Sequence, residues 1–122
     1  MGRDKLMLWG ARTDALYGLV STMEHAQRDI GRIAVPTVYL AGAHDQVIPK
    51  AAHRRAARKL KPSDRSAYYA KGYHLLLVDR QAALVYRDVE SFLRDPAAPL
   101  PSGAPPIPGA PTPPNTVVAK GR

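Results

Sequence analysis

Residues 33–45 read IAVPTVYLAGAHD and are the most informative stretch of the chain. Apolar side chains run through it almost without interruption, which is typical of a strand that is buried on both faces in a parallel sheet. Pro36 belongs near the start of such a strand, where a missing amide is tolerated. The residues from Gly42 to Asp45 then break the apolar pattern. The stretch therefore predicts a strand over residues 33–41, followed by a loop.

Helical and strand-like segments alternate on both sides of this strand. Before it, apolar residues recur at three- and four-residue steps over residues 13–30, as on one face of a helix. After it, residues 50–60 predict a second helix, and the short aromatic segment 66–70 predicts a second strand. A third helix is expected to begin at Asp79, a good N-cap, and to end at residue 93 or 94. The buried stripe of this last helix is expected to be Leu84, Val85, Val89, Phe92 and Leu93.

The order helix, strand, helix, strand, helix predicts an α/β fold with parallel strands. Two strands alone, however, do not form a stable sheet. A strand that is apolar on both faces also needs neighbours on both edges. We therefore expect the chain to be a piece of a larger α/β domain, or to pair with one.

Composition excludes several kinds of site. The 122 residues contain no cysteine, which rules out a disulfide framework, a Cys-ligated metal and a thiol nucleophile. The four histidines show no paired ligand spacing and there is no glycine-rich phosphate loop, so neither a metal nor a cofactor is expected. No stretch approaches the ~20 apolar residues of a transmembrane segment. The apolar run near the N-terminus is too short and too interrupted for a signal peptide, so we expect the cytoplasm as the default location.

The basic residues are unevenly distributed. The net charge is +8, and seven of the eighteen basic residues lie between Lys50 and Arg65, against a single acid, Asp64. Such a cluster fits either a nucleic-acid-binding patch or one solvated face of a helix. No aromatic residues are interleaved with these charges, as a base-stacking surface would need. The solvated helix face is the favoured interpretation, and no nucleic-acid partner is expected.

The C-terminal part of the chain is rich in proline. Nine of the twelve prolines lie between Pro96 and Pro114. Residues 96–122 carry almost no large apolar side chain, so they are expected to form a disordered tail that samples extended, polyproline-like conformations.

Two residues with catalytic chemistry follow the two predicted strands. Asp45 comes a few residues after the first strand, and His74 comes after the second. If the strands are parallel neighbours, both side chains emerge at the same edge of the sheet, where functional groups gather in open α/β sheets. Taken singly, each residue fits an ordinary turn or loop position. Together they predict an Asp–His pair in which the carboxylate orients the imidazole and stabilises its protonated form.

Two segments of the chain resemble the α/β-hydrolase family. Residues 35–49, VPTVYLAGAHDQVIP, resemble the acid-bearing segment of these enzymes, and residues 71–79, KGYHLLLVD, resemble their histidine segment. The resemblance is to the branch of monoacylglycerol lipases, lysophospholipases and serine-aminopeptidase-like hydrolases. It implies that Asp45 is the acid and His74 the general base of a Ser–His–Asp triad. The implied substrate is a small-molecule ester or a lipid ester.

The resemblance also implies how the chain is divided. Residues 1–31 resemble the end of the family's lid, or its return to the core. Residues 32–95 resemble the C-terminal part of the hydrolase core, with its last two strand–helix units. Residues 96–122 form the tail. The fold class is therefore expected to be α/β, with parallel strands in an incomplete sheet.

The chain departs from the family at the nucleophile. The family's serine lies in a Gly-x-Ser-x-Gly elbow, and no two glycines of this chain are four positions apart. Three explanations are open: a start codon further upstream, a split or decayed gene, and a fragment that complements another hydrolase chain. The sequence thus predicts the C-terminal part of a serine hydrolase, inactive alone. The alternatives are a non-catalytic fragment and a small basic binding module.

Overall fold

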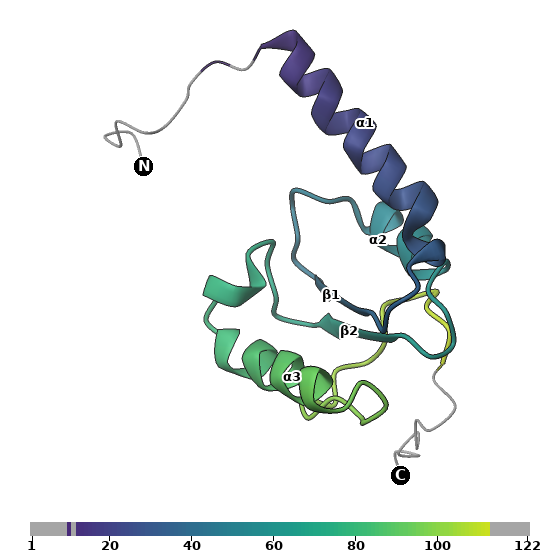
Figure 1. Cartoon of the computed structure of the whole chain (residues 1–122). Coiled ribbons are helices and arrows are strands. Elements are labelled where there is room, and N and C mark those ends of the chain that lie inside the picture. The colour runs from purple at the N-terminus through teal and green to yellow at the C-terminus, as the bar shows by residue number, and fades with distance from the viewer. Residues whose placement is uncertain (1–9, 11, 113–122) are drawn as a thin grey trace.

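A computed structural model describes Gly10 and residues 12–112 of the chain (Figure 1). Within these residues, no helix has the length and the apolar character needed to cross a membrane. The structure confirms the α/β order expected from the sequence. The elements are α1 (Thr13–Asp29), the 3-10 turn η1 (Ile30–Arg32), β1 (Val38–Gly42), α2 (Lys50–Ala57), β2 (Arg65–Tyr69), the 3-10 turn η2 (Leu76–Val78) and α3 (Ala82–Arg94).

The two strands lie side by side and are parallel, as the sequence predicts. Val38 of β1 is opposite Arg65 of β2, and Gly42 is opposite Tyr69. A parallel pair needs a crossover connection, and the segment that contains α2 supplies it. The sheet has two strands in the described part of the chain, so it is incomplete by the standard of a stable sheet. Because the strands run in the same direction, the loops that follow them meet at one edge of the sheet.

Side chains alternate between the two faces of the sheet and form two small cores. On one face, Ala41 of β1 packs in a cluster with Ala57 of α2. On the other face, Tyr69 of β2 packs with Val85 of α3. The two helices therefore cover opposite faces of the sheet, in keeping with their places above and below the strands in Figure 1.

The first strand begins later than the sequence predicts. Its first residue is Val38 rather than Ile33. The backbone N–H of Arg65 donates to the carbonyl of Thr37 at 2.9 Å, which is the first inter-strand bond. Val35 lies before that point and its side chain is exposed, because the neighbouring strand does not reach it. The apolar run that begins at Ile33 is thus longer than strand β1, which begins at Val38.

The last helix ends at Arg94, as the sequence predicts, but its start and its buried stripe differ from the prediction. Asp79 does not cap it, because the helix begins at Ala82. The Asp79 carboxylate instead accepts hydrogen bonds from the backbone N–H groups of Tyr73 and Arg80. At the other end Leu93, expected in the buried stripe, is 75% exposed. Helix α2 ends at Ala57, three residues before the predicted end.

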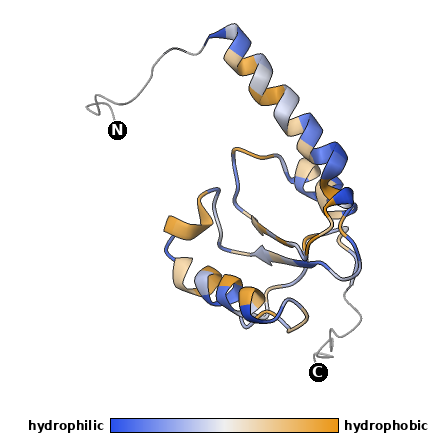
Figure 2. Cartoon of the chain, in the orientation of Figure 1, coloured by the Kyte–Doolittle hydropathy of each residue, from blue (hydrophilic) through white to orange (hydrophobic). Residues whose placement is uncertain are grey.

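Helix α1 presents its apolar stripe on an exposed face. None of its residues is buried. Figure 2 shows hydrophobic segments along a helix that extends away from the sheet. Its C-terminal end is held by the Nζ of Lys59, which donates to the carbonyl of Gln27 at 2.8 Å. The assignment of residues 1–31 to the end of a lid stays a prediction, and residues 1–9 and 11 lie outside the described residues.

The C-terminal segment is not the disordered tail that its composition predicts, at least as far as residue 112. It runs along the outer edge of β2, where the backbone N–H of Tyr68 donates to the carbonyl of Pro105 at 2.7 Å. The side chain of Ile107 is 1% exposed and completes the core beside α2. Proline cannot donate a hydrogen bond, but its carbonyl accepts one, so a proline-rich segment can still cover the edge of a strand. Residues 113–122 lie outside the described residues.

Two buried charged side chains fasten the same segment. Arg65 of β2 donates to the carbonyls of Ala97 and Ala98. Asp88 of α3 is fully buried and accepts hydrogen bonds from the hydroxyl of Tyr69, at 2.6 Å, and from the backbone N–H of Ser102, at 2.8 Å. This carboxylate therefore joins α3, β2 and the C-terminal segment.

Candidate functional site

The loops that follow β1 and β2 are bonded directly to each other. The backbone N–H of Ala43 donates to the carbonyl of Tyr69 at 2.9 Å, and that of His44 donates to Gly72 at 2.8 Å. A Cβ atom at Gly42 would lie 2.4 Å from the Gly72 carbonyl oxygen, so only glycine permits this close approach. The two loops are thus held in fixed register, and the residues that they carry lie close together.

Asp45 and His74 meet at this edge of the sheet, as the sequence predicts. The Nδ1 of His74 lies 3.0 Å from the Oδ2 of Asp45. The Asp45 side chain is 6% exposed, whereas that of His74 is 42% exposed. A carboxylate bonded to Nδ1 fixes the proton on that nitrogen and leaves the lone pair of Nε2 available on the opposite side of the ring. A buried carboxylate thus holds a partly exposed imidazole in the form that a general base requires.

The Asp45 carboxylate accepts four hydrogen bonds. Its Oδ1 accepts from the backbone N–H groups of Val47 and Ile48, at 2.8 and 2.9 Å. Its Oδ2 lies 3.0 Å from His74 and 3.3 Å from the Nε2 of His53. A carboxylate offers about four lone-pair positions, so each of them has a partner. The loop and two imidazoles therefore fix both the position and the rotation of this group.

These bonds keep Asp45 ionised. Burial raises the pKa of the carboxyl group, but the hydrogen bonds from Ile48, His74, Val47 and His53 oppose burial and prevail. Together they lower the pKa from 3.8 to about 2. The ionised Asp45 carboxylate stabilises an adjacent imidazolium, which is the role of the acid in an Asp–His pair.

His53 is a residue of the site that the sequence analysis missed. It lies in α2 with its side chain 7% exposed, and its two ring nitrogens contact Asp45 and the hydroxyl of Tyr39. One signal was present in the sequence: His53 is four residues before the buried Ala57, so both residues lie on the inward face of α2. A histidine on an apolar helix face needs polar partners, and here they come from β1 and from the loop after it.

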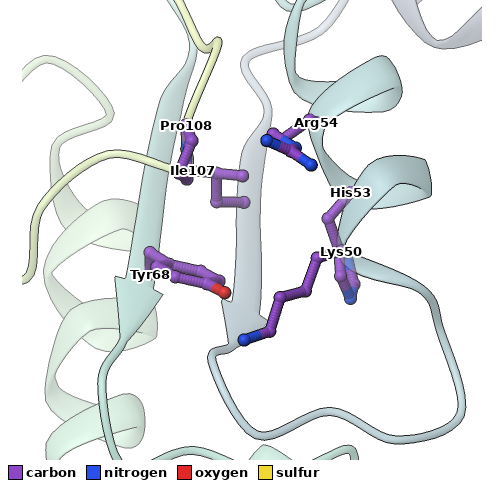
Figure 3. Close-up of a pocket in the computed structure, with 6 residues that line it drawn as sticks. All are labelled: Lys50, His53, Arg54, Tyr68, Ile107 and Pro108. Carbon is purple, nitrogen blue, oxygen red and sulfur yellow. The ribbon is translucent and has the colours of Figure 1, made fainter.

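Two hollows border the site. One, of about 350 Å³, lies beside His74 and is lined by apolar side chains of η2, β1 and α3. The other, of about 130 Å³, lies on the α2 face of the sheet, and Figure 3 shows Lys50, Arg54 and Tyr68 around it. His53 forms part of the wall of this smaller hollow. The apolar lining beside His74 suits an apolar group better than a charged one.

The described residues offer no obvious metal centre. Among them, no group of three His, Cys, Asp or Glu side chains is arranged to hold a metal ion. The nearest approach to such a group is Asp45 with His53 and His74, and the lone-pair positions of this carboxylate are all occupied by hydrogen bonds.

Comparison with known proteins gives the family. A search of curated proteins and a search of solved structures returned no significant match. The model of the family described as "Serine aminopeptidase, S33" matches residues 1–81, about two thirds of the chain, including both Asp45 and His74. The chain therefore belongs to the serine aminopeptidase S33 family of α/β hydrolases.

Proposed function

We propose that this protein is part of a serine hydrolase in which Asp45 is the triad acid and His74 is the general base. The observation that carries the proposal is the 3.0 Å hydrogen bond between Asp45 Oδ2 and His74 Nδ1, at the edge of the sheet where the two strands end. Membership of the serine aminopeptidase S33 family supports a hydrolase of the α/β type. Low exposure of the acid and partial exposure of the base match the two roles.

The chemistry follows from the tautomer of His74. Its free Nε2 accepts the proton of a serine hydroxyl while the serine oxygen attacks the carbonyl carbon of the substrate. The resulting imidazolium is stabilised by the ionised Asp45, and it returns the proton to the leaving group. An acyl-enzyme remains. His74 then takes a proton from water, which attacks the acyl carbon, and His74 returns this proton to the serine oxygen as the acyl–serine bond breaks and the acid leaves.

We infer that the serine belongs to polypeptide outside these 122 residues. The sequence has no Gly-x-Ser-x-Gly elbow. The same outside polypeptide would supply the oxyanion-binding N–H groups, which usually make the largest contribution to such catalysis. It is either a continuation of this chain or a complementing hydrolase chain. In both cases it must bring its serine to within hydrogen-bond reach of His74 Nε2.

We infer a carboxylic ester or a lipid ester as the substrate. The residues directly after His74 are apolar, and they line the 350 Å³ hollow together with Leu40 and Val85. Burial of this surface by an apolar acyl chain would stabilise the complex by about 25 cal/mol per Å² of apolar area. The resemblance to monoacylglycerol lipases and lysophospholipases supports the same class, whereas the family description also allows a peptide amide.

Hydrolysis of p-nitrophenyl esters by the protein isolated natively from its source cells tests the proposal. His74→Ala and Asp45→Asn are expected to lower kcat by about 10⁴-fold, because the base is lost or its tautomer is wrong. His25→Ala is the matched control, since His25 is an exposed histidine on α1. Circular dichroism of each variant checks that the fold is retained. Near-wild-type hydrolysis by His74→Ala would contradict the assignment.

A further inference from the structure

The His53 side chain is buried, and its Nε2 contacts Oδ2 of the Asp45 carboxylate. It comes from α2, whereas His74 comes from the loop after β2, so the two imidazoles reach the same Oδ2 from different elements. The bond from His53 is 3.3 Å long and the bond from His74 is 3.0 Å long. The other ring nitrogen of His53, Nδ1, is 2.7 Å from the hydroxyl of Tyr39. Side chains of four different segments thus form one connected row: Tyr39, His53, Asp45 and His74.

The direction of each hydrogen bond in this row follows from the charge states at its ends. The ionised Asp45 can only accept, so His53 Nε2–H donates to it. Burial, and then the negative charge of Asp45, raise the pKa of the Tyr39 phenol, so this hydroxyl keeps a proton with which it donates a hydrogen bond to His53 Nδ1. His53 Nδ1 therefore accepts, and the ring carries its proton on Nε2. Apart from the free Nε2 of His74, every side-chain polar atom of the row has a partner of the right kind.

We propose that His53 is a positioning residue of the site, which with Tyr39 fixes the Asp45 carboxylate so that His74 keeps its proton on Nδ1. This proposal rests on the proposed function for its catalytic consequence, although the tautomer of His74 is measurable without it. Asp45 has two backbone donors on Oδ1, and these leave Oδ2 dependent on the two imidazoles. Removal of His53 leaves Oδ2 with one donor, and the carboxylate gains freedom to rotate.

A purely structural role for His53 makes a different prediction. His53 also borders the 130 Å³ hollow on the α2 face (Figure 3), and an apolar side chain of similar size would fill that place in the core. His53→Leu keeps the volume and removes the donor. His53→Gln keeps a donor within reach of Asp45. If His53 only packs in the core, the His74 tautomer should be the same in both variants. If His53 positions Asp45, the tautomer should differ between them.

The test is ¹⁵N NMR of histidine-labelled protein, which distinguishes Nδ1–H from Nε2–H in each ring. In the wild type and in His53→Gln, His74 is expected to carry its proton on Nδ1. In His53→Leu, the Nε2–H form of His74 is expected to become populated. His25→Leu is the control for loss of one histidine. A His74 tautomer that is unchanged in a folded His53→Leu variant overturns the proposal.

Tyr39→Phe gives a second measurement if His53→Leu does not fold. This change removes one oxygen and leaves His53 in place. The ionised Asp45 keeps the His53 proton on Nε2, but His53 Nδ1 loses its donor, so the ¹⁵N signal of Nδ1 is expected to shift towards that of a nitrogen without a hydrogen bond. An unchanged ¹⁵N signal of His53 Nδ1 in Tyr39→Phe contradicts the row of bonds on which the proposal depends.

Ester hydrolysis separates this proposal from the proposed function. With the proposed function correct, His53→Leu is expected to lower kcat about tenfold, the effect of losing a hydrogen bond to a charged group, without a change in KM. His53→Gln is expected to recover most of that loss. If hydrolysis in the wild type does not depend on His74, the proposed function fails while the tautomer result stands. If hydrolysis depends on His74 but His53→Leu alters neither tautomer nor kcat, the positioning role alone fails.

Discussion

Asp45 is the residue on which the whole site depends. Two backbone N–H groups and two imidazoles surround its carboxylate. These partners come from three segments of the chain: the loop after β1, helix α2, and the loop after β2. A carboxylate with four partners is both a structural centre and a fixed negative charge, so its ionisation links the stability of this edge of the sheet to pH.

The pH dependence of stability tests this environment. The folded-state pKa of Asp45 is lowered from 3.8 to about 2. Its ionised form therefore contributes stability in full above about pH 4, and the contribution is lost as the pH falls towards 2. The difference in unfolding free energy between the wild type and Asp45→Asn is expected to be constant above pH 4 and to shrink below it. Denaturant titrations at several pH values measure it.

Glu24→Gln is the control for the loss of one carboxylate, because Glu24 is exposed on α1. If the difference in unfolding free energy between the wild type and Asp45→Asn is unchanged from pH 4 down to pH 2, the environment described for Asp45 is contradicted.

At the scale of elements, the edge of β2 explains why the C-terminal segment is ordered as far as residue 112. An open strand edge presents unpaired N–H and C=O groups, and proteins commonly cover such edges. Here the cover is a proline-rich segment that accepts a bond from Tyr68 and inserts Ile107 into the core beside α2. Arg65 and Asp88 fasten its beginning. The segment belongs to the folded unit.

Truncation of one side chain measures how much the C-terminal segment contributes to the unfolding free energy. Ile107→Ala is expected to lower the unfolding free energy by about 2–4 kcal/mol, because the removed side chain is 1% exposed and leaves a cavity. Leu93→Ala removes a similar side chain that is 75% exposed and is expected to change stability by less than about 0.5 kcal/mol. Equal effects in urea unfolding would show that residues 96–112 do not pack as described.

The sequence predicts the parts of this fold that depend on local pattern. The apolar run ending at Ala41 predicts a buried strand, and the order of elements predicts parallel pairing. That pairing brings Asp45 and His74 to one edge. The prediction fails where a single long-range contact decides the structure. His53 lies in a short helix whose apolar residues are mostly alanines, and its role depends on Tyr39 in another element. Composition, likewise, does not reveal that one isoleucine anchors the proline-rich segment.

At the scale of the whole molecule, the described residues leave two kinds of surface open. Helix α1 exposes an apolar stripe, and in residues 12–112 β1 is paired on one edge only. Helices α2 and α3 already cover the two faces of this sheet, so what it lacks in residues 12–112 is a further strand beside β1. Under the proposed function, the serine and its oxyanion donors also come from additional polypeptide. Both requirements are met if further parts of a hydrolase fold pack against β1 and α1.

The most direct measurement is covalent labelling with a fluorophosphonate probe, which reacts with an activated serine. The protein is isolated natively from its source cells through a tag after Arg122, labelled, and mapped by mass spectrometry. We expect the label on a Gly-x-Ser-x-Gly serine in polypeptide that is continuous with or bound to this chain. Labelling is expected to be lost in His74→Ala and retained in His25→Ala. No labelling of the wild type, or equal labelling of His74→Ala, would contradict the assignment of Asp45 and His74 as the acid and base of a serine hydrolase.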